Sequence, residues 1–367
     1  MSSSAGKQLD STPPTAPVEL TNGLTLSPRI KLLLTIHRAD ASVAAIDEWK
    51  LKRSLIDFLK NCFSHHPISL PEEDLHVRRF KDLKKLSRHD PVARVALFIR
   101  DLGFVVAAAK LVKSFRDEED EASMLEKKFV ECRKLLVVKM DGMEVNLEGV
   151  RFRVSVSVPI EDDFGRMMKE WEEFYAFEAG KTRGYSRGAR REPDTIILRG
   201  LPSRWFAEPR VSSKPSMLVT HTILSVFGKI RNINVAEDDD LGKDTDEDDE
   251  GIVSGLHCKV VVQFEKYRDF HNALKVLCSC SLQKEGSRMK ADYVVTWDKD
   301  GFFHNSRRHT QERTSRVPAV RDGRYRNEAS RRPTYDSRYS PDDDVRPKRF
   351  KVRKLVWSAG WCRTLNH

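Results

Sequence analysis

The order of predicted strands and helices repeats along the chain, and this repeat limits the fold more than any other feature of the sequence. Strands are predicted from short apolar or alternating runs, and helices from apolar residues spaced three and four apart. The first block has strands at residues 30–36, 74–80, 92–99 and 150–158 and helices at 42–63 and 103–115. The second has strands at 195–201, 231–235, 259–264 and 291–297 and helices at 214–230 and 268–280. Both blocks therefore follow the order β-α-β-β-α-β.

This order predicts an α+β protein made of two ferredoxin-like domains, with disordered tails at both ends. We place the first domain at residues 20–178, with an acidic helical insertion near 117–136, and a Gly/Arg/Ser-rich linker at 179–193. The second domain covers residues 194–303 and contains an acidic loop at 236–251. Residues 1–19 and 304–367 hold too few large apolar side chains to form a core, so they are the predicted tails.

Apolar stripes predict which helical side chains face a core. In the first block the stripe consists of Ile46, Trp49, Leu55, Ile56, Leu59 and Phe63, and in the second of Met217, Ile223, Leu224 and Phe227. A third stripe follows the first block and consists of Phe164, Met167, Met168, Trp171, Phe174 and Tyr175. We expect this last helix to pack on the sheet of the first domain; the alternative is a groove on a partner protein.

Two segments of opposite charge lie in and after the second domain. The acidic one separates two of its predicted strands, and the basic one follows its last strand. Residues 237–250 hold ten acidic residues and one lysine, a net charge of −9. Residues 299–354 hold 17 Lys or Arg and 8 Asp or Glu, a net charge of +9. The acidic run is either a solvated insertion or an inhibitory segment that contacts the cationic tail.

The tail also contains Ser-Arg steps and a compact basic run. Phosphorylation would reverse the local charge, and the expected sites, with SR-protein kinases as candidate enzymes, are Ser315, Ser330, Thr334 and Ser340. The basic run is predicted to act in nuclear import or phosphate binding through Arg346, Lys348, Arg349, Lys351, Arg353 and Lys354.

The second block resembles the RNA recognition motif (RRM), in which a four-stranded sheet backed by two helices stacks bases on aromatic side chains. Residues 197–201 (ILRGL) and 257–264 (HCKVVVQF) stand where the two signature sequences of that motif lie. Ile197, Lys259 and Val261 hold the stacking positions, and each lost ring removes about 1–3 kcal/mol per base. We expect these three side chains to face outward from adjoining central strands, and RNA to be bound mainly through cations.

Five further residues of this domain are candidates for nucleic-acid contact. Arg199, with Lys259, would bind phosphates, and Tyr293 and Trp297 would stack on bases unless they serve ordinary sheet packing. Arg204 and Trp205 follow the first strand, where the indole would stack on a base or anchor the loop.

Three stretches carry a more specific resemblance. Residues 190–207, 212–235 and 257–270 are similar to the A-kinase anchor protein 17A-like family of splicing-associated RRM proteins. The resemblance implies a nuclear, speckle-associated protein that binds single-stranded pre-mRNA and splicing factors and influences splice-site choice. That family also anchors protein kinase A through amphipathic helices in a Lys/Glu-rich region. In this chain the region after the RRM contains Pro318, Pro333, Pro341 and Pro347, which interrupt helices. Anchoring of protein kinase A is therefore not expected.

The sequence favours neither an enzyme nor a membrane protein. It has no phosphate-binding glycine loop, metal-ligand spacing or nucleophile motif, so no catalytic residue, metal or cofactor is expected. Residues 104–112 are the longest apolar run and are interrupted by Lys110, whereas a membrane span needs about 20 residues. The six cysteines have no CxxC pair and are expected to be free thiols of a soluble intracellular protein.

Two functions remain open at this point. The leading hypothesis is a non-enzymatic nuclear RNA-binding protein that acts in pre-mRNA splicing regulation. The alternative is a protein-interaction scaffold, in which a degenerate RRM binds splicing factors or serves as a kinase anchor.

Overall fold

A computed structural model describes residues 14–39, 46–63, 66–80, 90–113, 121–181, 192–209, 211, 213–238 and 256–303. The chain divides into two units, Met1–Glu312 and Arg313–His367, and every described residue belongs to the first. The predicted tails, apart from residues 14–19, and most of the linker and the acidic loop lie outside the described residues. The same is true of the predicted phosphorylation sites and of the basic run at 346–354.

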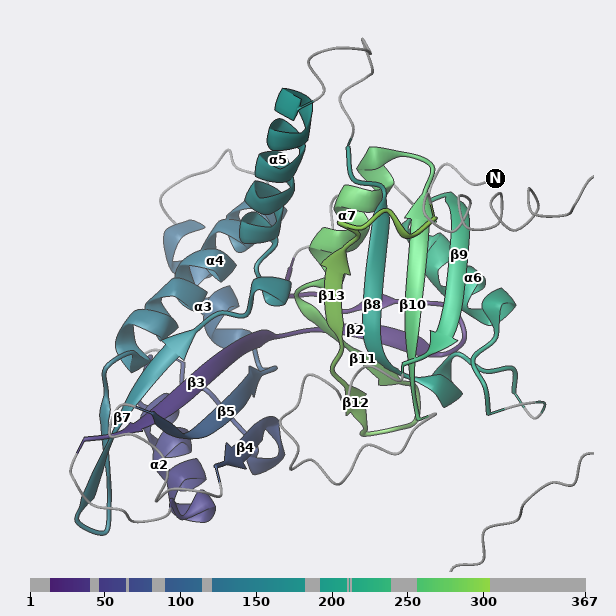
Figure 1. Cartoon of the computed structure of the whole chain (residues 1–367). Helices are drawn as coiled ribbons and strands as arrows, with labels where there is room; N and C mark the ends of the chain where they lie inside the picture. Colours follow the sequence, from purple (N-terminus) through teal and green to yellow (C-terminus); the bar gives the residue numbers. More distant parts are fainter. Residues whose placement is uncertain are drawn as a thin grey trace, which may run out of the picture. The chain divides into compact units, whose positions relative to one another are not determined.

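The first predicted block forms a five-stranded antiparallel sheet with the order β4-β5-β3-β7-β6 (Figure 1). Its strands are β3 (Ile30–Arg38), β4 (Leu75–Arg79), β5 (Pro91–Ile99), β6 (Glu144–Leu147) and β7 (Val150–Ser157). Alternate side chains point to one face and form a core, as with Leu34, Val95 and Val154, because successive residues of a strand face opposite sides.

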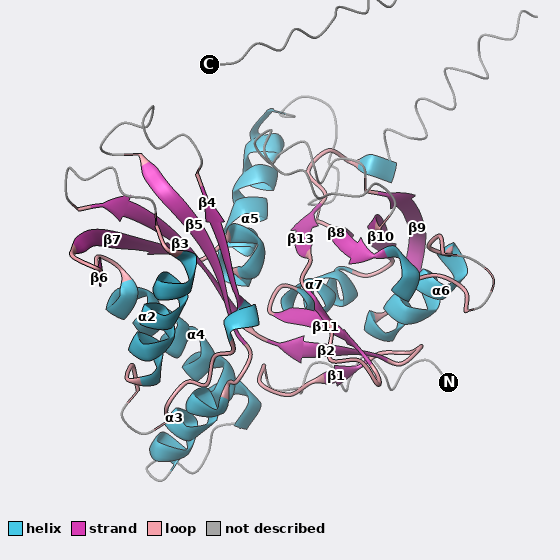
Figure 2. Ribbon diagram, turned by 90° about the horizontal axis from the view of Figure 1, so that it is seen from below, coloured by secondary structure: helices cyan, strands magenta, loops and turns pink. Residues whose placement is uncertain are grey.

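Three helices cover the core face of this sheet: α2 (Glu48–Lys60), α3 (Gly103–Lys113) and α4 (Glu121–Met140) (Figure 2). The α2 helix begins where the carboxylate of Asp47 accepts hydrogen bonds from the backbone N–H groups of Trp49 and Lys50, which satisfies two otherwise unpaired donors. The predicted stripe of this helix is wrong at Trp49, which is 55% exposed. The predicted helical insertion is confirmed as α4.

The second predicted block forms a four-stranded antiparallel sheet with the order β13-β8-β10-β9. Its strands are β8 (Thr195–Pro202), β9 (Ile230–Glu237), β10 (His257–Phe264) and β13 (Val294–Trp297), and its helices are α6 (Met217–Leu224) and α7 (Tyr267–Leu277). Phe227, Phe264 and Phe270 are buried in its core. Met217 was predicted to point inward but is 53% exposed, because it occupies the first position of α6.

A third sheet joins the N-terminal residues to the second block, in the order β1-β2-β11-β12. It consists of β1 (Val18–Glu19), β2 (Leu24–Pro28), β11 (Cys280–Lys284) and β12 (Lys290–Ala291). Leu24 and Leu26 are buried in the second core. Residues 18–28, which we had assigned largely to the first domain, therefore pack with the second.

The α5 helix (Phe164–Lys181) also packs with the second block. Met167 and Trp171 belong to the second core, and the Trp171 ring lies 5.6 Å from that of Phe270 between centroids. The prediction that this helix covers the first sheet is wrong. The apolar stripe shows that α5 must pack on another surface, but the spacing of its residues does not identify that surface. In the structure the surface is provided by aromatic residues of α7.

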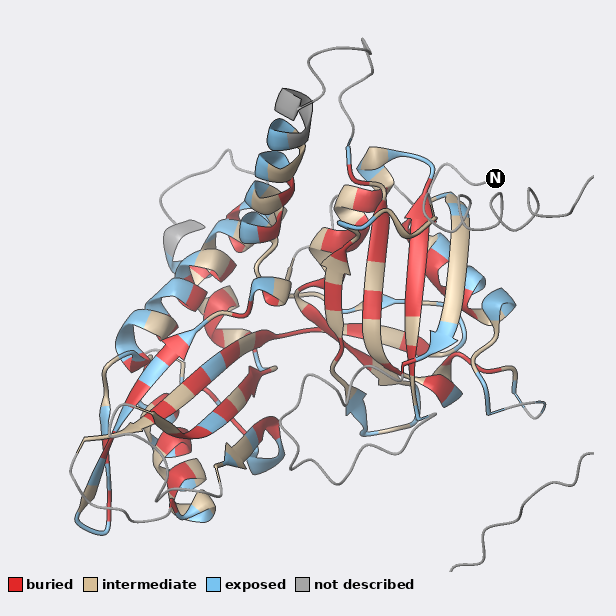
Figure 3. Cartoon of the chain, viewed as in Figure 1, coloured by how far each residue is buried: buried red, intermediate tan, exposed pale blue. Residues whose placement is uncertain are grey.

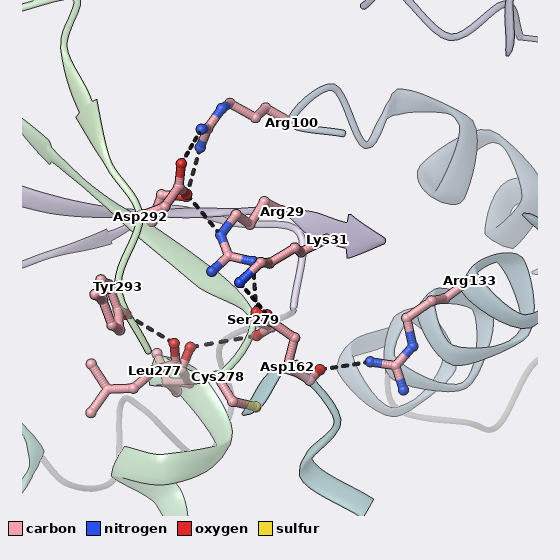
Figure 4. A network of polar contacts seen from close by, with 12 residues as sticks. Arg29, Lys31, Arg100, Arg133, Asp162, Leu277, Cys278, Ser279, Asp292 and Tyr293 are labelled. Carbon is pink, nitrogen blue, oxygen red and sulfur yellow. Dashed lines mark hydrogen bonds and ion pairs between the residues drawn. The ribbon is translucent and has the colours of Figure 1, made fainter. Parts of the chain in front are cut away.

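Buried charges connect the two blocks at Arg29, the single residue between β2 and β3 (Figure 4). Arg29 is 2% exposed; its Nη1 lies 2.6 Å from Asp162 Oδ1, and its Nε lies 3.1 Å from Asp292 Oδ1. Arg100, which follows β5, reaches the other oxygen of Asp292 at 2.8 Å. A buried charge needs a partner, and here the partners come from both blocks.

The described chain is thus an α+β protein with antiparallel sheets and six helices. Both main sheets have helices on one face, and their strand orders are compatible with RRM-like domains.

Candidate nucleic-acid interface

The face of the second sheet that lies away from α6 and α7 contains the three predicted stacking positions. Ile197 on β8 pairs directly with Val261 on β10, so these positions lie on adjoining central strands, and Lys259 faces the same side two residues earlier. The intervening residues Leu198 and Val260 belong to the core on the opposite face. We call the face that carries Ile197, Lys259 and Val261 the β10 face.

The chain segment after β13 covers part of the β10 face. In Figures 1 and 2, this last described segment lies across β8 and β10 on the side away from the helices. The carboxylate of Asp298 accepts hydrogen bonds from the backbone N–H groups of Asp300, Gly301 and Phe302, which fixes the turn. The rings of Phe302 and Phe303 lie 5.1 Å apart, edge to face. This aromatic pair was not among the predicted site residues, although its sequence position next to the last strand could have indicated it.

Val261 is buried, with 1% of its surface exposed, although we expected it to face solvent. Most of β10 is buried in the same way (Figure 3). Gln263 on this face is buried too; its amide donates to Asp194 Oδ2 at 2.8 Å and accepts from Asn232 Nδ2 at 2.6 Å. This end of the β10 face is therefore closed by hydrogen-bonded amides and offers no stacking surface.

Arg199, predicted to bind phosphate, has a carboxylate partner. Its Nη2 lies 3.2 Å from Oδ1 of the buried Asp238, and the backbone N–H of Gly200 donates to the other oxygen at 3.1 Å. Asp238 directly follows β9 and belongs to the acidic run. Lys259 is half-buried on the same face, and no ion pair joins it to another described residue. Of these two cations, Lys259 is therefore the one whose charge is not neutralised by a carboxylate of the described residues.

The predicted positions of Tyr293 and Trp297 on this face are wrong, since both side chains are buried in the core on the helix side. The Tyr293 hydroxyl donates to the carbonyl of Leu277 at 2.9 Å, and burial raises the pKa of this tyrosine well above its ordinary value. Trp297 Nε1 donates to Glu170 of α5 at 3.3 Å. The period of two along β13 explains the error, because Val294 and Thr296 take the outward positions.

Arg204 and Trp205 lie apart from the β10 face, in a one-turn 3-10 helix after β8. They line a hollow of about 530 Å³ together with residues of the third sheet region, including Asn22 and Lys284. Arg204 is exposed and Trp205 is half-buried. The structure therefore does not bring these two residues together with Ile197, Lys259 and Val261.

The described residues offer little for catalysis or metal binding. They contain no group of three His, Cys, Asp or Glu side chains able to hold a metal ion. Their five cysteines are free and buried, and burial raises the pKa of Cys258 and of Cys280 to about 12. These thiols therefore stay protonated at neutral pH. Within the described part of the chain, no helix is both long and apolar enough to span a bilayer.

An open antiparallel sheet backed by two helices is the architecture with which the RNA recognition motif binds RNA. A sequence profile described as "AKAP-17A-like, RNA-binding domain" matches residues 125–336. The chain belongs to this family, which confirms the resemblance found in the sequence. The match begins within α4, so it includes the whole second sheet but not β3, β4 or β5.

Two individual proteins are also similar to this chain. Human A-kinase anchor protein 17A (Homo sapiens) is 29% identical over 177 residues, which cover 47% of this chain and 24% of the relative. The chain thus spans about a quarter of that relative's length. A solved Cas6 substrate mimic complex overlaps 74% of this chain and 100% of its own, at 10% identity and a TM-score of 0.25. That score is too low to indicate a shared fold.

Proposed function

We propose that this protein binds single-stranded pre-mRNA in the nucleus and regulates splicing without catalysing a reaction. The observation that carries the proposal is the family's RNA-binding domain at residues 125–336, which includes the complete β10 face. The nuclear and splicing parts are supported by the splicing role of the family that the sequence resembles. Splicing factors, and SR-protein kinases acting on the Ser-Arg steps of the tail, are the proposed protein partners.

The strand orders support two RRM-like, ferredoxin-like domains. In the second block, β8, β9, β10 and β13 are the first to fourth strands, and their spatial order is fourth, first, third, second. The first block repeats this order with β3, β4, β5 and β7. In the RRM such a sheet presents its two central strands to RNA. In the second block these strands are β8 and β10.

The side chains of the β10 face are better suited to electrostatic contacts with phosphate than to stacking on bases. Stacking would contribute about 1–3 kcal/mol per base, but Ile197 and Val261 provide no ring. Lys259 can instead attract a phosphate, and such contacts weaken as salt rises because binding releases counterions. We therefore propose weak, salt-dependent and sequence-tolerant binding by this face.

Replacing Lys259 with glutamine tests this proposal. We expect Lys259→Gln to weaken binding of a labelled single-stranded RNA and to reduce the slope of log affinity against log salt by about 0.7. The matched control is Lys290→Gln, which removes an exposed lysine from β12, outside the β10 face. If both variants bind RNA with the same affinity and slope as the original chain, Lys259 does not contact RNA.

Two observations favour the alternative function, a scaffold that binds splicing factors or a kinase. The segment 298–303 lies across the β10 face, and Asp238 already neutralises Arg199. Ultraviolet crosslinking in nuclei separates the two functions. Crosslinked RNA supports the RNA-binding proposal, whereas protein partners that survive nuclease treatment, without any crosslinked RNA, support the scaffold.

A further inference from the structure

The first sheet also has a face without helices, to which the sequence analysis gives no function. The family profile includes β6 and β7 of this sheet but not β3, β4 or β5. This face lies opposite α2, α3 and α4 (Figure 2), and strand β7 alternates strictly between exposed and buried residues along it (Figure 3). We call the side that carries Thr35, Arg94 and Ser155 the β5 face. The neighbouring residues Leu34, Val95 and Val154 point the other way, into the first core.

The registers place cations and hydroxyl groups in rows across the β5 face. In one row, Arg94 of β5 lies directly between Arg78 of β4 and Thr35 of β3. Ser155 of β7 continues the same row beyond Thr35. Directly opposed side chains in a sheet have Cβ atoms about 4.5–5.5 Å apart, so this row presents two guanidinium groups and two hydroxyls side by side.

The next row adds a further cation. Arg153 of β7 pairs with His37 of β3 on one side and with Glu144 of β6 on the other. Glu144 belongs to the outermost strand, so the acidic side chain lies at the edge of the sheet. Arg151, two residues before Arg153, is exposed on the same side.

The accessible cations of this face are suited to phosphate. Arg94 and Arg153 are exposed, and the guanidinium carbon of Arg94 lies 5.5 Å from the centre of the Phe80 ring. A guanidinium that stacks on a ring keeps its edge available for two parallel hydrogen bonds to a phosphate. Arg78 has interactions within the protein, and Lys31 is paired with Asp162, so Arg94 and Arg153 are the principal candidates.

We propose that the β5 face is a second binding surface for single-stranded RNA, which it contacts through the phosphate backbone. The face has arginines and hydroxyls but no exposed aromatic pair on its central strands, so it would bind with little sequence preference. It is more cationic than the β10 face, where Asp238 neutralises Arg199. The choice of RNA over an acidic protein rests on the proposed function, because an RNA held by one face is at high effective concentration for the other.

The full chain carrying Arg94→Gln and Arg153→Gln together tests this surface. We expect fluorescence anisotropy with a labelled single-stranded RNA to show weaker binding and a slope of log affinity against log salt reduced by about 1.4, since two phosphate contacts are lost at about 0.7 each. Matched controls are Arg53→Gln and Lys134→Gln, which remove two exposed cations from α2 and α4 on the helix side. The double change to lysine should retain the slope, because it keeps both charges.

Each outcome separates this inference from the proposed function. If Lys259→Gln reduces the slope while the Arg94/Arg153 variant behaves like its controls, the β5 face does not bind RNA and the proposed function stands. If the original chain binds no RNA, the proposed function fails as well. A variant that loses binding of labelled polyglutamate but keeps its RNA affinity would overturn the inference in favour of an acidic protein partner.

Discussion

At the scale of single residues, the buried Arg29 is expected to contribute to the free energy of unfolding. It is buried between Asp162 and Asp292, which belong to different parts of the chain. Removing one partner of a buried ion pair leaves an uncompensated charge and costs about 3–5 kcal/mol. We expect Arg29→Met to lower the free energy of unfolding by this amount in urea denaturation. Lys50→Met, which breaks an exposed pair with Glu148, should cost far less, because water screens exposed ion pairs; equal costs would contradict the role of Arg29.

One carboxyl of this group, that of Asp292, predicts how the stability of the protein depends on pH. Burial opposes ionisation of Asp292, but Arg29, Arg100 and a hydrogen bond from Ser281 together hold the pKa of this carboxyl below its ordinary value of 3.8. A carboxyl with a lowered pKa stabilises the folded state above its ordinary pKa, and this contribution is lost as pH falls through the lowered value. We therefore expect stability to fall below about pH 4, and to fall less steeply in Asp292→Asn. If the stability of the two proteins falls in parallel as pH is lowered, Asp292 does not cause the loss of stability.

At the scale of elements, α5 depends on its contacts with the second core. Trp171 is buried against Phe270, and removing a large buried ring costs about 3–5 kcal/mol. We expect Trp171→Ala to lower the unfolding free energy by this amount and to increase hydrogen exchange in α7. Phe177→Ala serves as the control, because Phe177 is on the same helix and 65% exposed. If α7 is protected equally in both variants, α5 does not stabilise the second core.

The strands and most helices could be predicted because their apolar periodicity is local. Long-range contacts could not, since nothing near residues 24–28 or 164–181 in the sequence specifies the partners that they meet at β11 and α7. The candidate site shows the same limit. The pairing of β8 with β10 followed from the motif, but a one-residue difference in phase placed Tyr293 and Trp297 on the wrong face. The β5 face was missed because its cations become neighbours only when four strands pair.

At the scale of the whole molecule, we expect both the folded part and the charged tail to contribute to RNA affinity. We expect the folded part to contribute cations on the β10 and β5 faces, chiefly Lys259 together with the proposed Arg94 and Arg153. Residues 299–354 carry a net charge of +9, and cationic side chains attract phosphate whatever the sequence of the nucleic acid. Only a folded surface, however, would make binding depend on particular positions of β5, β7 and β10.

The most direct test measures the affinity for single-stranded RNA as a function of salt, with the full chain and with a chain that ends at Phe303. The shorter chain keeps every described residue. We expect it still to bind RNA, with a slope of log affinity against log salt that is smaller than that of the full chain but clearly negative. If all binding disappears when the residues after Phe303 are removed, the sheet faces are not an RNA-binding surface.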